Sequence, residues 1–235
     1  MKSQLPVGES LPNWTPRPAP PHTAMTGRHC RVEPLDPRLH AADLYAAYSE
    51  DHDNVSWTYL PYGPFPGYEE FYSWATQAAS QEDPLFYAII PNGSGKAEGI
   101  ASYLRISPPD GVIEVGHINF SPRLQKTAAA TEAMYLMMNR VFEELGYRRY
   151  EWKCDALNSG SRAAAQRLGF HAEGIFRQAT IYKGRNRDTA WFSLIDRDWP
   201  EVKNAMEQWL SPDNFDVQER QKLRLSDLIV KPHRN

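Results

Sequence analysis

A run of small and polar residues between two apolar segments is the first candidate binding site. Residues 121–130 read SPRLQKTAAA and lead from an apolar stretch at 114–120 into a segment with helical spacing. A helix N-terminus presents unpaired N–H groups and partial positive charge, which suit a pyrophosphate. Ala128 and Ala130 would let phosphates approach the backbone, and Lys126 would add a charge. The alternative is an ordinary strand-to-helix connection without a ligand.

A second polar run, NSGSR at 158–162, is followed by Leu-Gly-Phe at 168–170. Asn158 and Ser161 are residue types that cap helix N-termini, and Gly169 is a type that ends helices. Taken alone, this run is explained by a short capped helix. The two runs together, in this order, are a more specific indication of a binding site than either run alone.

Periodicity predicts the elements that position these runs. Apolar segments indicate strands at 28–35, 85–91, 98–106, 112–120 and 150–154, and a hairpin of 170–183 with 188–195 across Gly184-Arg185-Asn186. The Asn92-Gly93-Ser94-Gly95 turn makes the second and third of these strands antiparallel neighbours. Helices are expected from Pro37 through Tyr48, at 69–79, from Ala130 to Gly146, and in the short segment that ends at Gly169.

The composition indicates a globular chain with one α/β domain. Of 235 residues, 41% are hydrophobic and 12% aromatic, while the net charge of -3 indicates no broad basic surface, so nucleic acid is not an expected partner. Cys30 and Cys154 fit neither a disulfide framework nor a metal-ligand spacing, so no metal is expected. The start lacks a secretory signal and no run approaches the roughly 20 apolar residues of a membrane span, which favours a cytoplasmic protein.

The two ends of the chain differ from its centre. Residues 1–24 are rich in proline and predict an extended arm, which Trp14 would pin to the body. Residues 200–228 predict two helical pieces separated by Ser211-Pro212-Asp213, packed on the domain or on a second subunit of a homodimer. The expected division is an arm at 1–24, a domain at 25–199 and a helical extension at 200–235.

The ordered motifs resemble the GNAT superfamily of N-acetyltransferases, in the branch of the ribosomal-protein N-terminal acetyltransferases. The matching residues are Glu114-Val115-Gly116-His117, Gln125 through Ala133, Asn158-x-x-Ser161-Arg162, Leu168-Gly169-Phe170, and the hairpin with Asp188 and Trp191. The resemblance implies an α/β (α+β) fold in which helices flank a central mixed, mostly antiparallel twisted sheet. It covers most of the chain, from about residue 25 to residue 200.

The resemblance also implies that acetyl-coenzyme A (acetyl-CoA) is the acetyl donor. The family's pyrophosphate loop reads Gln or Arg, two variable residues, Gly, one variable residue, then Gly or Ala. Ala128 stands where Gly is expected, a departure that would weaken coenzyme binding. The implied coenzyme site comprises the loop, the splayed end of a strand and the second polar run: Gln125, Lys126, Thr127, Ala128, Ala129, Ala130, Ile118, Asn119, Phe120, Asn158, Ser161 and Arg162.

Acetyl transfer requires a neutral amine, so some group must take up a proton. The resemblance assigns this role to Glu114, directly or through water. His117 has a suitable reference pKa and is the substitute base. The Tyr that many relatives use as an acid is Ala165 here, and the branch implies Ser161 instead. Each has a structural alternative: a hydrogen-bonded strand carboxylate, a packed histidine and a helix cap.

The acceptor site is expected at an aromatic loop and the hairpin tip. Trp57, Tyr59, Tyr62 and Phe65 match the region that shapes the acceptor site in relatives, and Tyr182 and Arg185 would bound the same cleft. Core packing is the alternative for these aromatics. The expected function is acetylation of a primary amine, on a small molecule or a protein N-terminus.

Two other functions are considered. Ala128 and the missing helix Tyr would also suit a catalytically impaired coenzyme A-binding or regulatory module. A nucleotide-phosphate binder would need glycines before Gln125-Lys126-Thr127, and these are absent.

Overall fold

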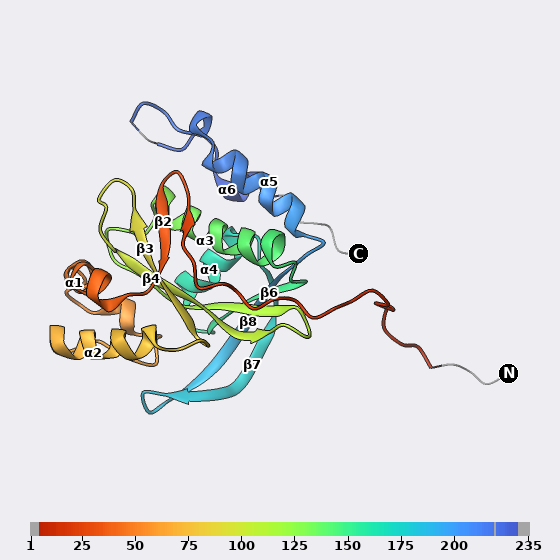
Figure 1. Cartoon of the computed structure of the whole chain (residues 1–235), viewed down its shortest axis with the longest axis horizontal. Coiled ribbons are helices and arrows are strands. Elements are labelled where there is room, and N and C mark those ends of the chain that lie inside the picture. The colour runs from red at the N-terminus through yellow and green to blue at the C-terminus, as the bar shows by residue number, and fades with distance from the viewer. Residues whose placement is uncertain (1–4, 219, 230–235) are drawn as a thin grey trace.

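The computed structural model describes residues 5–218 and 220–229, and its strands form a sheet in the order β1-β2-β3-β4-β5-β6-β8-β7 (Figure 1). The strands are β1 (Met25–Thr26), β2 (Cys30–Pro34), β3 (Leu85–Pro91), β4 (Gly99–Ser107), β5 (Val112–Phe120), β6 (Arg149–Asp155), β7 (His171–Tyr182) and β8 (Arg185–Ile195). Neighbouring strands are antiparallel except β5 and β6, which are parallel. The predicted mixed, mostly antiparallel sheet is confirmed.

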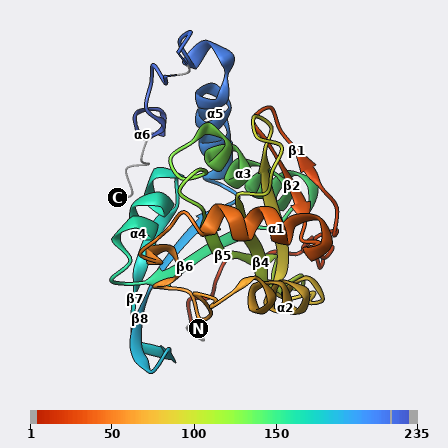
Figure 2. The same cartoon turned by 90° about the vertical axis from the view of Figure 1, so that its left-hand side faces the viewer.

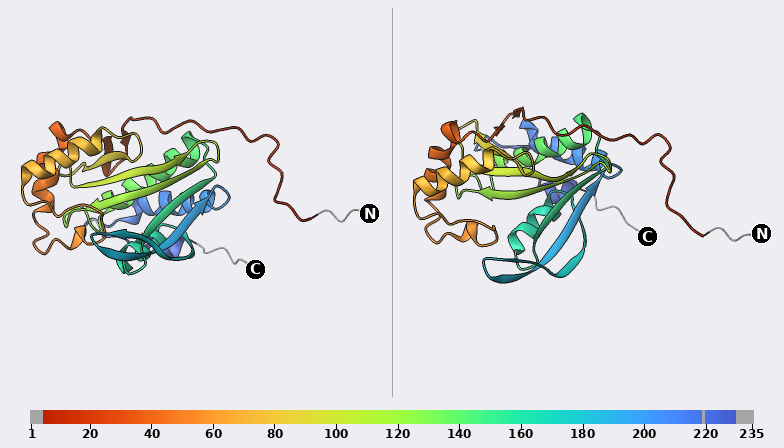
Figure 3. Two further views of the ribbon diagram at one scale, coloured as in Figure 1. Left: turned by 90° about the horizontal axis from the view of Figure 1, so that it is seen from below. Right: turned by 60° about the horizontal axis from the view of Figure 1, so that its bottom comes forward.

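Helices cover both faces of the sheet (Figures 2 and 3). One face carries α1 (Pro37–Tyr48) and α2 (Tyr68–Ala79), and the other carries α3 (Ala128–Asn139), α4 (Ser159–Arg167) and α5 (Trp199–Leu210), followed by α6 (Leu225–Leu228). Side chains alternate between the two faces of a strand, so Phe86 and Ile90 of β3 join the core under α1 and α2, while Tyr87 and Ile89 join the other core. This explains why β3 is apolar along its length.

Local capping places the helix starts. Pro37 is the first residue of α1, and the side chain of Asp36 accepts a hydrogen bond from the amide of Arg38. The helix expected from Ala130 to Gly146 begins two residues earlier, at Ala128, and continues after Asn139 as a π-helical segment, Arg140–Glu144. Gly146 then takes a left-handed φ of 66°.

Two expected elements have different bounds. The β7–β8 turn consists of Lys183 and Gly184, whose φ angles of 48° and 70° suit a two-residue hairpin turn, so Arg185 already belongs to β8. The second C-terminal helical piece is only the short α6. The Asn214 side chain donates hydrogen bonds to the carbonyls of Trp209 and Leu223, and so holds the chain between α5 and α6 in a loop.

Backbone carbonyls tie the proline-rich arm to the domain. Trp14 Nε1 donates to the carbonyl of Pro109 at 2.7 Å, and Tyr147 Oη donates to that of Pro18 at 3.0 Å. The prolines of the arm offer carbonyls but no N–H groups, so the donors come from other residues of the arm, such as Trp14, and from side chains of the body, such as Tyr147. The start of the arm leads away from the body (Figure 1). At the other end, α5 packs on α3 and contributes Met206 and Trp209 to the same core.

Candidate functional site

The candidate site is centred where two parallel strands, β5 and β6, stop pairing. The β5–β6 register ends at Val115↔Trp152, although β5 continues to Phe120 and β6 to Asp155. The β4–β5 register also shifts around His117, whose φ is 50°. This bulge and the loss of pairing leave the β6-facing edge of residues 116–120 without a partner strand.

This unpaired stretch contains Ile118, Asn119 and Phe120, the strand residues of the expected coenzyme site. Ile118 and Phe120 pack against the core on the α3 side, and Tyr48 Oη donates to the carbonyl of Asn119 at 2.9 Å. The Asn119 side chain is buried, and neither of its polar atoms has a hydrogen-bond partner among the described residues. Buried polar groups are normally paired, so this amide suits a bound polar ligand or an ordered water.

The small-residue run forms the start of α3. Thr127 Oγ1 caps the helix by accepting from the amide of Ala130 at 3.1 Å, whereas no described residue accepts from the amides of Ala128 and Ala129. Ala128 is the first helical residue and does not take a positive φ, so alanine causes no backbone strain there. The positive φ, 63°, belongs to exposed Lys126. Two amides thus remain available for an anion.

The end of β5 is fastened to this loop by Gln125. Its Nε2 donates to the carbonyl of Phe120 at 2.8 Å. The methyl groups of Ala129 and Ala130 are buried in the core, so they fix the helix start rather than face a ligand. The expected loop residues therefore divide into amide donors, a cap and structural contacts.

The second polar run begins α4 beside the loop end of β6. Asn158 Oδ1 accepts from the amide of Ser161 at 3.0 Å, which is the capping role considered above. Ser161 Oγ accepts from Trp152 Nε1 at 2.9 Å, so its own proton points to another acceptor, and the Cys154 side chain lies within hydrogen-bonding reach of this hydroxyl. Arg162 is exposed and donates to the carbonyl of Ala156. Ala165 is fully buried and supplies no acid.

Glu114 is buried in an ion-pair network. Its Oε2 lies 2.8 Å from Arg105 Nη1 and 2.8 Å from Lys153 Nζ. Lys153 Nζ also lies 2.7 Å from Glu151 Oε2 and stands 3.8 Å over the Trp191 ring. Glu114 faces Glu151 where β5 and β6 are still paired, before the strands separate. Two cations therefore already compensate the charge of the Glu114 carboxylate. The role of Glu114 as a base remains a prediction.

His117 stands at the bulge and packs among aromatic rings. Its Nδ1 lies 3.1 Å from Tyr62 Oη, and the two rings are stacked. Burial lowers the pKa of His117 to about 4, and the positive charges of Arg105 and Arg187 add to this effect. At neutral pH the imidazole is therefore uncharged and a weak base.

The aromatic residues expected at the acceptor site have different environments. Tyr62 lines a cavity of about 250 Å³ together with His117. Trp57 is buried against Tyr48, and Phe65 packs in the same aromatic cluster. The complete lining of the cavity comprises Tyr62, Trp74, Gln77, Ala78, Gln81, Pro84, Phe86 and His117.

The aromatic loop and the hairpin tip meet across the end of β6. Tyr59 Oη donates to the carbonyl of Leu157 at 3.2 Å, and Lys183 Nζ donates to the carbonyl of Trp57 at 2.7 Å. Tyr182 Oη donates to Asp155 Oδ2 at 2.9 Å. The structure therefore brings these two predicted acceptor regions together.

Three residues near the site were not expected from the sequence: Trp152, Lys153 and Arg187. Trp152 and Lys153 are consecutive strand residues whose side chains point to opposite faces, a pattern that is readable in the sequence. Their partners, however, lie on other elements and become visible only in the folded chain.

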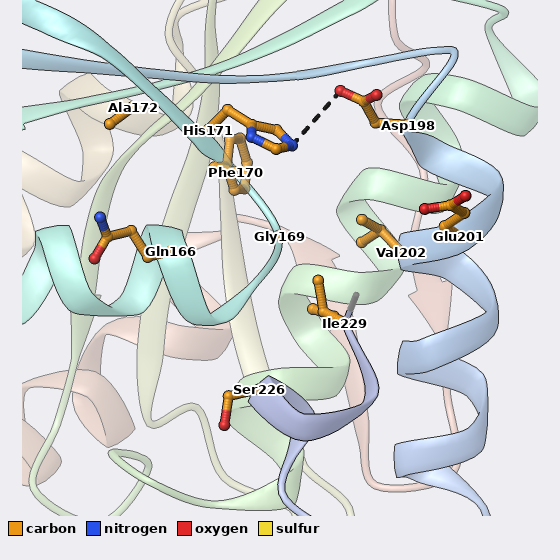
Figure 4. Close-up of a pocket in the computed structure, with 10 residues that line it drawn as sticks. All are labelled: Gln166, Gly169, Phe170, His171, Ala172, Asp198, Glu201, Val202, Ser226 and Ile229. Atoms are coloured by element: carbon orange, nitrogen blue, oxygen red, sulfur yellow. Dashed lines mark ion pairs between the residues drawn. The ribbon is translucent and has the colours of Figure 1, made fainter. Parts of the chain in front are cut away.

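A second cavity, of about 160 Å³, lies between the end of α4, the start of β7 and the helices α5 and α6 (Figure 4). His171 Nε2 and Asp198 Oδ2 lie 3.7 Å apart at its edge. None of the expected site residues lines it. Among the described residues, no group of three or more His, Cys, Asp or Glu side chains could hold a metal ion. No described helix is long and apolar enough to cross a membrane.

The lowered pKa of His117 predicts a pH-dependent stability. Because the folded protein disfavours the charged imidazole, the contribution is fully present above pH 6.5 and is lost as pH falls toward 4. In the wild-type chain this loss amounts to about 3 kcal/mol. We expect His117→Asn to remove it, because asparagine does not titrate and is a residue type that tolerates a positive φ. Urea unfolding of both proteins at pH 7 and 4 measures it. A constant stability difference between them at both pH values would contradict the prediction.

Comparisons with known proteins agree with this arrangement. The acetyltransferase (GNAT) domain family matches residues 30–171. The crystal structure of a GCN5-related N-acetyltransferase from Brucella melitensis has 47% sequence identity and a TM-score of 0.91, covering 93% of this chain and 99% of that chain. The microcin C7 self immunity acetyltransferase MccE, in complex with acetyl-CoA and AMP, has 21% identity and a TM-score of 0.62, covering 72% and 93%; this likeness concerns the fold alone.

A sequence relative matches the chain over a shorter region. The protein named putative ribosomal N-acetyltransferase YdaF, from Bacillus subtilis, is 33% identical over 73 residues. This match covers 31% of the chain and 40% of that relative, so the chain spans less than two thirds of the relative's length.

Proposed function

The chain belongs to the GNAT acetyltransferase family, and on that premise we propose that it transfers an acetyl group from acetyl-CoA to a primary amine by direct attack. The acceptor amine is on a small molecule or at a protein N-terminus. One observation carries the proposal: the amides of Ala128 and Ala129, which have no acceptor among the described residues, begin α3 next to the edge of β5 that β6 no longer pairs. An anion-binding helix start beside open strand edges fits a long phosphorylated donor.

The described residues fit acetyl-CoA on this observation. The two amides and Lys126 would hold the pyrophosphate, and Asn119 with the unpaired edge of β5 would meet the polar pantetheine arm. Asn158, Ser161 and Arg162 would bound its other side. When bound, the donor supplies an activated thioester; transfer forms a C–N bond, breaks the C–S bond and moves a proton from nitrogen to sulfur.

Ser161 is proposed to donate the hydrogen bond that stabilises the leaving sulfur. The indole of Trp152 occupies the Ser161 oxygen as an acceptor and so orients the hydroxyl proton away from the indole. The amine would lose its proton to water or to Glu114, while His117 shapes the acceptor side as a neutral ring. These roles are consistent with the burial and hydrogen bonds of each residue.

Binding and turnover test the proposal separately. We expect acetyl-CoA to bind in calorimetry and thiol release to depend on an added amine. The alternative, a coenzyme-binding module without catalysis, is motivated by Ala165 in place of the acid. It would be supported by binding without thiol release across a panel of small amines and N-terminal peptides. Failure to bind acetyl-CoA would exclude both.

Substitution of Ser161 tests the leaving-group role. Ser161→Ala is expected to lower kcat roughly 10²-fold with little change in KM for acetyl-CoA, because the hydrogen bond forms as sulfur gains charge. Trp152→Phe keeps an aromatic ring but loses the indole N–H that orients Ser161. It should lower kcat less than Ser161→Ala does. Ser159→Ala, at an exposed serine of the same helix, is the control. An unchanged kcat in Ser161→Ala would remove this residue from the mechanism.

A further inference from the structure

Arg187 is a half-buried arginine beside the site without an acidic partner among the described residues. Its Nε donates to Thr189 Oγ1 at 3.1 Å, and its guanidinium lies 5.8 Å from the centre of the Tyr182 ring. No carboxylate of the described chain forms an ion pair with it. The Thr189 and Tyr182 contacts orient the planar guanidinium but leave its other N–H groups without an acceptor in this part of the chain.

The carboxylates of β5 and β6 are already engaged by other groups. Glu114 is held by Arg105 and Lys153, and Asp155 accepts from Tyr182 Oη and from the amide of Leu157. Glu151, further along β6, pairs with Lys153 and Arg149. Arg187 therefore has no counter-charge among the residues that the structure describes.

The position of Arg187 places it at the acceptor side of the opening. The β6–β8 pairing ends at Asp155↔Thr189, so Arg187 lies on β8 just past the end of β6, beyond the point where β6 separates from β5. The charge of Arg187 acts on residues of both β5 and β6. Burial lowers the pKa of His117 on β5, and Arg187 lowers it further. Burial raises the pKa of Cys154 on β6, and Arg187 opposes this rise.

We propose that Arg187 binds an anionic group of the acceptor, so that the acceptor is a small amine that also carries a carboxylate or a phosphate. The inference rests on the proposed acetyl transfer and narrows its substrate class. A guanidinium fork matches both anions in a two-bond geometry.

Matched acceptor pairs test this proposal. Initial rates of thiol release are compared for an amino acid and its amide, and for phosphoethanolamine and ethanolamine, with acetyl-CoA as donor. The wild-type protein is expected to use at least one anionic member with a kcat/KM roughly 10-fold or more above that of its neutral partner. The two pairs distinguish carboxylate from phosphate recognition.

Variants then assign the preference to Arg187. Arg187→Gln should raise KM for the anionic acceptor by roughly 10–100-fold. It should leave KM for the neutral acceptors unchanged and KM for acetyl-CoA within about twofold of the wild-type value. Arg187→Lys should recover part of the loss, and Arg177→Gln, on exposed β7, is the matched control.

The outcomes separate this inference from the proposed function. Thiol release with equal use of neutral and anionic amines would overturn the inference alone. So would a higher KM for acetyl-CoA in Arg187→Gln, since Arg187 would then serve the donor. Absence of thiol release from every amine would overturn the acetyl transfer and the inference with it.

Discussion

Replacing Ala128 with aspartate is expected to weaken acetyl-CoA binding roughly 10²–10³-fold while the fold keeps its stability. Ala128 is the first residue of α3, and its amide is one of the two without an acceptor in the described chain. An aspartate there would repel a bound pyrophosphate, since like charges about 4 Å apart cost several kcal/mol at a protein surface. The same carboxylate favours the helix N-terminus, so stability should hold or rise slightly.

Ala128→Asp is expected to weaken acetyl-CoA binding without lowering stability, so a loss of binding cannot be attributed to a misfolded protein. Calorimetric titration with acetyl-CoA measures affinity, and thermal unfolding without the ligand measures stability. Ala128→Asn has nearly the same shape without the charge and should lose much less affinity. If Ala128→Asp binds acetyl-CoA as tightly as the wild-type chain, the coenzyme phosphates do not lie at the start of α3.

Replacing Glu132 with alanine is expected to destabilise the fold by about 4 kcal/mol. The buried Glu132 carboxylate on α3 accepts from the amides of Arg28, His29 and Cys30 at 2.9, 2.6 and 2.8 Å. Alanine would leave these three N–H groups without their acceptor and detach the β1–β2 turn from the helix. Gly27 belongs to the same contact, because a Cβ there would lie 2.4 Å from the Glu132 carboxyl group.

Urea unfolding measures the loss, and thermal unfolding should show a midpoint lower by about 10 °C. Glu132→Gln retains one carbonyl oxygen and should show an intermediate loss. Glu82→Gln, at an exposed loop position, is the control for removing one negative charge. A change below 1 kcal/mol in Glu132→Ala would show that water replaces the carboxylate at little cost.

The local signals of the sequence anticipated much of the fold. Pro37 and Asn158 each indicated a helix start, and both starts are capped, whereas the cap by Thr127 begins α3 two residues before the expected Ala130. Such signals work because a cap bonds an amide only two or three residues away. The hairpin turn was placed too late, since Lys183 takes a left-handed φ that its residue type does not announce.

The sequence by itself determined the order of strands and helices, the start of α3 that suits a phosphate, and the resemblance that predicts the acetyl donor. Those features depend on neighbours along the chain. Only the tertiary structure decided which charges are compensated: Glu114 meets Arg105 and Lys153 from two other strands, whereas Arg187 meets no carboxylate in the described chain. Electrostatic partners are set by distance in space, so a residue's type alone could not distinguish a paired charge from one available to a substrate.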